Sequence, residues 1–80
     1  MINIQDFADF LAVELDPKIR VETNGDFIIV TCDDRGIQID CREFKEKVKF
    51  PEAESSVAIT AKIITHAFQK AGVLHHFSQN

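Results

Sequence analysis

The sequence has no tryptophan or tyrosine, only two cysteines, and no long apolar run. Its uninterrupted apolar stretches reach only four residues, as in 27–30, far short of the roughly 20 that cross a bilayer. Residues 1–6 hold neither a basic nor a long apolar segment, so we expect no signal peptide. Two cysteines, Cys32 and Cys41, are too few for the disulfide framework of a small secreted domain. These absences predict a soluble cytoplasmic protein.

What is present is the composition of one globular domain. The chain has 80 residues, of which 45% are hydrophobic and 28% are charged, so we expect a single domain over residues 1–80. The net charge is −4 and it is unevenly placed: residues 1–40 carry nine acidic and three basic side chains, and residues 41–80 carry four and six. The acidic half argues against broad nucleic-acid binding, which needs several cations facing phosphates.

Two segments have apolar residues at helical spacing. The first, 3–15, begins at Asn3, a good N-cap residue with Asp6 at the capping-box position, and it ends before Pro17. The second, 56–71, precedes Gly72, which is suited to a Schellman C-cap. The expected core stripes are Ile4, Phe7, Ala8, Leu11 and Leu15 in the first helix, and Val57, Ala61, Ile64, Phe68 and Ala71, widened by Ile63 and Ala67, in the second.

Three stretches are predicted strands, at 19–23, 27–32 and 37–41; the first and third alternate between apolar and polar residues, whereas the second is apolar at nearly every position. Between the first two lies Asn24-Gly25, a strong signal for a two-residue hairpin loop because both residues tolerate positive φ. Residues 33–36 separate the second stretch from the third and predict a four-residue loop closed by glycine. The chain therefore predicts a three-stranded antiparallel meander.

These loops set the expected register of the sheet. They pair Val21 with Ile28 and Cys32 with Ile37, which directs the apolar residues of all three strands to one face. A three-residue second loop would turn Ile37 and Ile39 to the other face, so the four-residue loop is preferred. The expected inward residues are Ile19, Val21, Ile28, Val30, Cys32, Ile37, Ile39 and Cys41.

The predicted architecture is α+β, a three-stranded antiparallel β-meander with two helices packed on one face in the order α-β-β-β-α. Residues 42–50 fit either a helical turn or a strand, and residues 73–77 are apolar without a readable period. The conformation of both segments stays open at this stage.

No pattern of catalytic or metal-binding residues is apparent. His66, His75 and His76 lack the spacing of zinc ligands, and adjacent histidines in a strand point to opposite faces. In the expected register Cys41 lies opposite Ile28 and is too far from Cys32 for a disulfide, so both thiols are expected to be reduced and buried. We therefore predict no enzyme activity, metal or cofactor.

The second strand is apolar on both faces, which is unusual for a sheet with one open side. If Ile28 and Val30 face the helices, Phe27 and Ile29 face away from them. Either the tail or the connector covers this pair, or it binds a partner. The predicted partner-binding residues are this pair and acidic residues on or beside the hairpin turns: Phe27, Ile29, Glu22, Asp26, Asp33 and Asp34.

The expected function is protein binding: a small acidic regulator, inhibitor or adaptor that occupies a partner's surface. The layout and acidity resemble those of several phage-encoded inhibitors, including some anti-CRISPR proteins. One alternative is a homo-oligomeric structural or assembly subunit, such as a homodimer through the sheet face. A weaker alternative is a nucleic-acid-binding module that uses the basic and aromatic connector 42–50, in which Glu43 and Glu46 leave little net charge.

Overall fold

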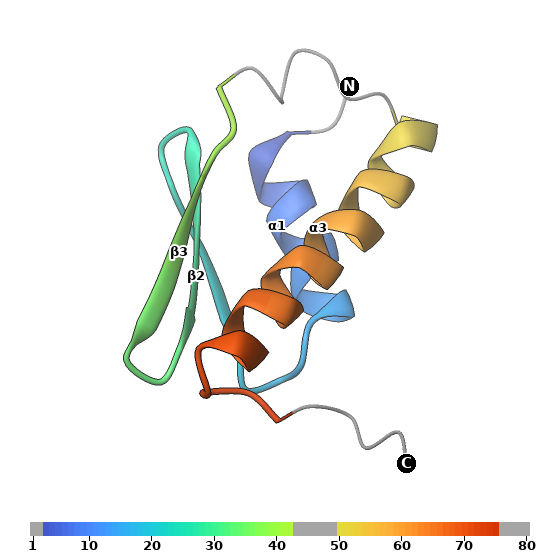
Figure 1. Ribbon diagram of the computed structural model, residues 1–80. Helices are drawn as coiled ribbons and strands as arrows, with labels where there is room; N and C mark the ends of the chain where they lie inside the picture. Colours follow the sequence, from blue (N-terminus) through green and yellow to red (C-terminus); the bar gives the residue numbers. More distant parts are fainter. Residues whose placement is uncertain (1–2, 43–49, 76–80) are drawn as a thin grey trace.

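The computed structural model describes residues 3–42 and 50–75, with the backbone alone described at 50–54. The elements are α1 (Ile4–Glu14), β1 (Arg20–Asn24), β2 (Phe27–Cys32), β3 (Arg35–Asp40) and α3 (Phe50–Lys70). The strands form one antiparallel sheet in the order β1-β2-β3, and both helices lie on the same side of it (Figure 1). The predicted α-β-β-β-α fold is confirmed. Within the described residues no helix is both long and apolar enough to span a membrane.

Helix α1 begins and ends where its sequence signals lie. The backbone N–H of Asp6 donates to the side-chain oxygen of Asn3 at 2.8 Å, which satisfies one of the unpaired donors of the first turn. Leu15 ends the helix in an extended conformation, two residues before Pro17. The predicted N-cap is therefore confirmed. The sequence also places Ile2 and Phe7 at the positions of a hydrophobic staple, but Ile2 lies outside the described residues.

Helix α3 begins at Phe50, six residues before the predicted start at Ser56. Pro51 does not prevent this, because the first turn of a helix has no intrahelical partner for the N–H that proline lacks. At the other end Gly72 has φ of +84° and its N–H donates to Gln69 at 3.1 Å, while the N–H of Val73 donates to Phe68 at 3.1 Å. These two bonds confirm the predicted Schellman cap.

The first hairpin has the predicted faces in a different register. Asn24 pairs with Phe27, so the loop is Gly25-Asp26 rather than Asn24-Gly25, and Val21 lies opposite Val30 instead of Ile28. Gly25 takes a φ of +62° at the first central position of the turn, as a type II′ turn requires. The shift is two residues, so each side chain keeps its face.

The second hairpin is shifted in the same way. Its loop has two residues, Asp33 and Asp34, rather than four, and Cys32 pairs with Arg35. Asp33 takes a φ of +54°, which aspartate tolerates better than most residues, so Gly36 is not needed to close the turn. Ile37 consequently lies opposite Val30, and it still faces the helices.

The core is a single layer between the sheet and the two helices. The stripe in α1 is buried as predicted except that Ile4 is half-buried, but three of the residues predicted for the core side of the second helix are not buried. Ile63 is 64% exposed because it stands about 100° away from Ile64 around the helix. Ala67 is half-buried, and Ala71, which continues the spacing 57, 61, 64 and 68, is exposed just beyond the end of α3 at Lys70. The buried residues are Phe7, Ala8, Leu11, Leu15, Ile19, Ile28, Val30, Cys32, Cys41, Val57, Ala61, Ile64 and Phe68.

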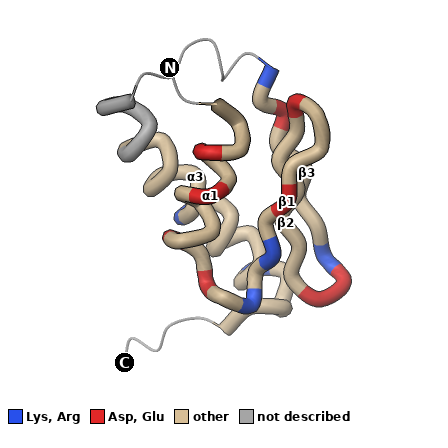
Figure 2. The backbone as a smooth tube through the Cα atoms, turned by 180° about the vertical axis from the view of Figure 1, so that it is seen from behind, with Lys and Arg blue, Asp and Glu red and all other residues tan. Residues whose placement is uncertain are grey.

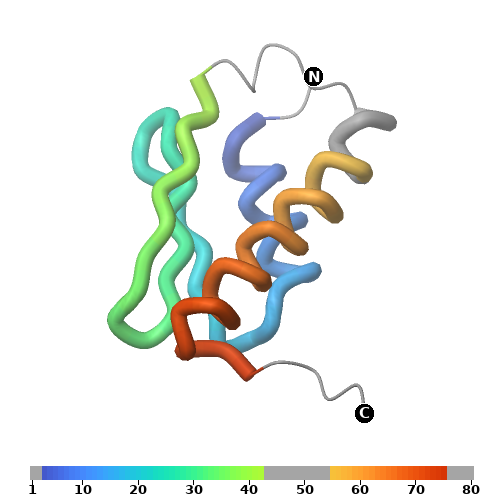
Figure 3. The backbone as a smooth tube through the Cα atoms, viewed as in Figure 1, coloured from blue at the N-terminus to red at the C-terminus, as the bar shows by residue number. Residues whose placement is uncertain are grey.

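The segment that follows α3 packs against the segment between α1 and β1, at the end of the sheet that holds the β2–β3 turn (Figure 3). The ammonium of Lys18 donates to the backbone carbonyl of Val73 at 2.9 Å and forms an ion pair with Asp33 at 3.2 Å. Lys18 therefore joins three segments that are far apart in the sequence. Val73 and Leu74 are half-buried against the core, so the described part of the tail belongs to the folded domain.

Candidate protein-binding surfaces

The open face of the sheet carries the predicted apolar pair. Phe27 and Ile29 both point away from the helices and are half-buried. In the observed register Ile29 lies between Glu22 on β1 and Gln38 on β3. The pair is therefore a narrow apolar strip on the central strand, flanked on both sides by exposed polar residues.

Part of this strip is covered by the chain itself. The guanidinium of Arg42 lies over the ring of Phe27, 5.6 Å from its centroid, within the range of a cation–π contact. Arg42 is held there by Asp40, which accepts hydrogen bonds from Nε at 3.0 and 3.1 Å. The start of the connector therefore shields Phe27 in part, which reduces the apolar area available to a partner.

The Arg42–Asp40 pair gives a prediction for acid titration. Hydrogen bonds from the Arg42 side chain and backbone lower the pKa of Asp40 to about 2. Because this folded pKa lies below the usual value of about 3.9, the pair stabilises the fold above that value, and the contribution is lost as the pH falls through about 2. We expect the Asp40 carboxyl to titrate near 2 by NMR and to return toward its ordinary range in Arg42→Ala. An unchanged titration in that variant would contradict the contact.

Three of the predicted acidic residues have a basic neighbour. Arg20 lies 3.7 Å from Glu22, Lys18 lies 3.2 Å from Asp33, and the third pair, Arg35 with Asp34, is 4.0 Å apart. All are exposed, and surface pairs of this kind hold their partners weakly. These acids therefore remain accessible, but their negative field is partly offset.

The structure does not gather the predicted acidic residues into one site. Asp26 occupies the β1–β2 turn, and its backbone carbonyl accepts the N–H of Cys41 at 2.8 Å. Asp33 and Asp34 occupy the β2–β3 turn at the far end of the six-residue strand β2, about 20 Å away at 3.4 Å per residue. The six residues of the predicted site consequently extend along the whole length of the sheet.

Helix α1 carries a more compact surface that was not predicted from the sequence. Phe10 is 39% exposed and Val13 is 83% exposed, which makes Val13 the most exposed large apolar residue of the described chain. Asp6, Asp9 and Glu14 share their side of the helix, because positions 6, 9, 10, 13 and 14 follow the i, i+3, i+4, i+7, i+8 pattern. We call these five residues the acidic face of α1.

The carboxylates of the acidic face differ from those of the hairpins in having no cation beside them. No described lysine or arginine comes within 4.0 Å of Asp6, Asp9 or Glu14. Figure 2 shows the acidic positions following one another along α1, and Asp9 accepts a hydrogen bond only from the neutral Gln5, at 2.9 Å. This face therefore combines exposed apolar area with carboxylates that form no ion pair with a described residue.

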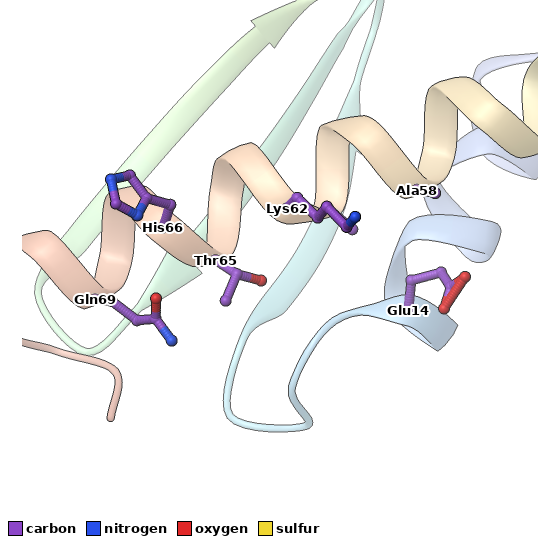
Figure 4. Close-up of a pocket in the computed structure, with 7 residues that line it drawn as sticks. Glu14, Ala58, Lys62, Thr65, His66 and Gln69 are labelled. Atoms are coloured by element: carbon purple, nitrogen blue, oxygen red, sulfur yellow. The ribbon is translucent and has the colours of Figure 1, made fainter. Parts of the chain in front are cut away.

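A shallow groove of about 580 Å³ runs between α1 and α3, next to this face. Glu14 contributes to it from α1, whereas Lys62, Thr65 and Gln69 contribute from α3 (Figure 4). His66 points away from Thr65 and Gln69, and none of the groove's titratable groups forms an ion pair with another. Among the described residues no three histidine, cysteine, aspartate or glutamate side chains are grouped to hold a metal ion.

Residues 43–49 of the basic connector lie outside the described part of the chain, so the structure describes only Arg42 and the backbone of Phe50 from that predicted nucleic-acid surface. Arg42 is occupied by Asp40 and Phe27, as shown above. The comparisons with known proteins add no family to this description: no protein-family model matches the chain, and no curated protein or solved structure does.

Proposed function

We propose that this protein is a binding module that occupies the surface of another protein through the acidic face of α1. The observation that supports this most is the exposure of Val13 and Phe10 among carboxylates that have no described lysine or arginine within 4.0 Å. Large apolar side chains in water cost free energy in proportion to their area, and a partner that covers them recovers it. The proposed role is that of a regulator, inhibitor or adaptor.

The side chains of the acidic face indicate the kind of protein surface that would bind it. Phe10 and Val13 stand one helical turn apart, as anchors for an apolar pocket, while Asp6, Asp9 and Glu14 border them. The complementary surface has an apolar centre and a rim of lysine or arginine side chains. Such charges speed the encounter and orient the two proteins more than they add affinity.

The proposal is for binding rather than catalysis. The groove beside α1 holds Glu14, Lys62 and His66, but none of these is paired with another as a catalytic acid and base or nucleophile and base would be. We further propose that the protein acts in the cytoplasm, which agrees with two unpaired, buried cysteines. The likeness in layout and charge to phage-encoded inhibitors fits this mode of action.

The test begins with affinity capture from cells of the organism that encodes the protein. Proteins retained by the wild type are compared with those retained by a Phe10→Ser, Val13→Ser variant, whose two exposed changes leave the buried stripe of α1 intact. We expect a partner that the wild type retains and the variant loses. If the variant and the wild type retain the same proteins, the acidic face is not the binding surface.

Once a partner is known, two matched charge reversals separate the candidate surfaces. Asp9→Lys with Glu14→Lys and Asp33→Lys with Asp34→Lys change the net charge equally, the first pair on α1 and the second on the β2–β3 turn. We expect the α1 pair to slow association by about tenfold or more at low salt and to flatten its salt dependence. The turn pair should have a smaller effect. A larger effect of the turn pair would place the site at the hairpin instead.

A further inference from the structure

Strand β3 forms a free edge of the sheet. It pairs with β2 on one side, and no described element runs along its other side (Figure 1). The opposite edge of the sheet is formed by β1 and differs, because α1 packs against β1 and Gln5 accepts a hydrogen bond from the Thr23 hydroxyl at 3.2 Å. Between residues 36 and 40 β3 has no proline, and its helix-facing residues are isoleucines. Proline and inward-facing charge are common devices that keep edge strands from pairing; β3 has no proline, and its one helix-facing charge is Arg35, at the first position of the strand beside the turn.

The hairpin geometry determines which backbone groups of β3 face outward. Cys32 and Arg35 flank a two-residue loop, so they exchange backbone hydrogen bonds, and the bonded pairs then recur at every second residue. The N–H of Cys41 donates to Asp26, which continues this series of odd-numbered residues along β3. The N–H and C=O groups of Gly36, Gln38 and Asp40 therefore point to the free edge.

We propose that β3 pairs with β3 of a second copy of this chain in antiparallel orientation, with Gln38 opposite Gln38, to form a six-stranded sheet. The outward-facing groups then meet as hydrogen-bonded pairs: Gln38 with Gln38, and Gly36 with Asp40 on both sides of the twofold axis. The sheet of the dimer is continuous, and the acidic face of α1 takes no part in this contact. This inference does not rest on the proposed function.

Electrostatics selects this register over its two nearest alternatives. With Gln38 opposite itself, Asp34 in the turn before β3 of one copy comes level with Arg42, just after β3 of the other. Two opposite-charge pairs then form if the exposed Arg42 guanidinium exchanges Asp40 for Asp34 of the second copy. A shift of two residues in one direction places Asp34 opposite Asp40, which is repulsive. A shift in the other direction centres the pairing on Ile39, and Asp34 and Arg42 no longer face each other.

The same register completes the burial of two half-buried residues. Ile37 and Ile39 face the helices and are each only partly covered within one chain. In the dimer Ile37 lies opposite Ile39 of the other copy, in non-hydrogen-bonded pairs, where cross-strand side chains approach most closely. Opposite residues of an antiparallel pair point to the same face, so the helices of both copies lie on one side of the sheet.

The test is a pair of charge variants, Asp34→Arg and Arg42→Asp, examined alone and mixed by sedimentation velocity and native mass spectrometry. In the proposed register a dimer of either variant alone has two pairs of like charges, because residues 34 and 42 then carry the same sign. A heterodimer with one copy of each variant has two opposite-charge pairs again. We expect a wild-type dimer, dissociation constants raised about tenfold or more for each variant alone, and a heterodimer in the equimolar mixture. A monomeric wild type, or a mixture no more associated than its components, would overturn the proposal.

A second pair of variants tests the edge itself without changing charge. Gln38→Pro removes an N–H that points to the free edge of β3, a position at which a strand tolerates proline. Thr23→Pro removes the equivalent outward N–H on the edge of β1, together with the exposed hydroxyl that donates to Gln5, and serves as the control. Both should remain folded by circular dichroism, and only Gln38→Pro should be monomeric. Dimerisation that persists in a folded Gln38→Pro variant would contradict pairing through β3.

Discussion

Replacing Ile28 and Val30 together with threonine is expected to unfold the domain, whereas the same replacement of Phe27 and Ile29 should leave it folded. The two pairs alternate along β2, so their side chains lie on opposite faces of the sheet. Ile28 and Val30 have no exposed surface and lie in the core beneath the helices. A threonine at either position buries a hydroxyl without a partner in place of an apolar group, and at Ile28 it also leaves part of the former volume empty.

The free energy that each double replacement costs can be compared with the stability of the whole domain. A buried unsatisfied hydroxyl costs about 1–3 kcal/mol and the lost methyl group or methylene about 0.5–1.5 kcal/mol, so the inner pair loses roughly 3–9 kcal/mol. An 80-residue domain is stable by about 4–12 kcal/mol in total. Threonines that replace the outer pair, Phe27 and Ile29, keep their hydroxyls near water, and threonine is favourable in a strand. The loss of stability is therefore smaller than for the inner pair.

Urea unfolding followed by far-UV circular dichroism measures both double variants against the wild type. We expect the outer variant to keep a cooperative transition at a moderately lower midpoint, and the inner variant to show no native baseline. If the outer variant unfolds as readily as the inner one, Phe27 and Ile29 belong to a second core, covered by the chain beyond Arg42. That result would also remove the open face from the candidate binding surfaces.

The faces of the strands could be predicted from the sequence, but their register could not. Alternation of apolar residues has a period of two, so any even shift between strands preserves it, and both hairpins differ from the prediction by two residues. Registers that differ by two residues can be distinguished only by the length and conformation of the turn. Asp33 adopts a positive φ that the sequence analysis assigned to the glycine at 36, and Gly25 takes the first rather than the second place in its turn.

The candidate site was harder to predict for a related reason. Sequence periodicity identified the buried stripe of α1, and Asp6, Asp9 and Glu14 lie off that stripe. The second stripe at 6, 9, 10, 13 and 14 has the same helical spacing, so the signal was present, but its meaning depends on tertiary contacts. Only the structure shows that α3 leaves Val13 exposed and that no described cation within 4.0 Å offsets the charge of Glu14.

The cysteines provide the other large expected effect: in the native protein both thiols should react with a water-soluble disulfide reagent about a thousandfold more slowly than in urea. Cys32 and Cys41 are each only 1% exposed, and burial raises the pKa of both thiols, which lowers the fraction of reactive thiolate. Reaction then requires opening of the fold, which costs at least about 4 kcal/mol if the whole domain must unfold.

The same measurement tests the sheet register. Cys41 bonds to the backbone of Asp26, and Cys32 lies six residues further along the strand, so the two thiols stand about 20 Å apart. A disulfide needs Cα atoms within about 7 Å, so mild oxidation of the monomer should leave both cysteines reduced. A bond between them in non-reducing mass mapping would contradict the arrangement of β2 and β3. Rapid labelling of Cys32 alone would instead show that the cap at Val73, whose carbonyl accepts its thiol at 3.5 Å, opens independently of the sheet.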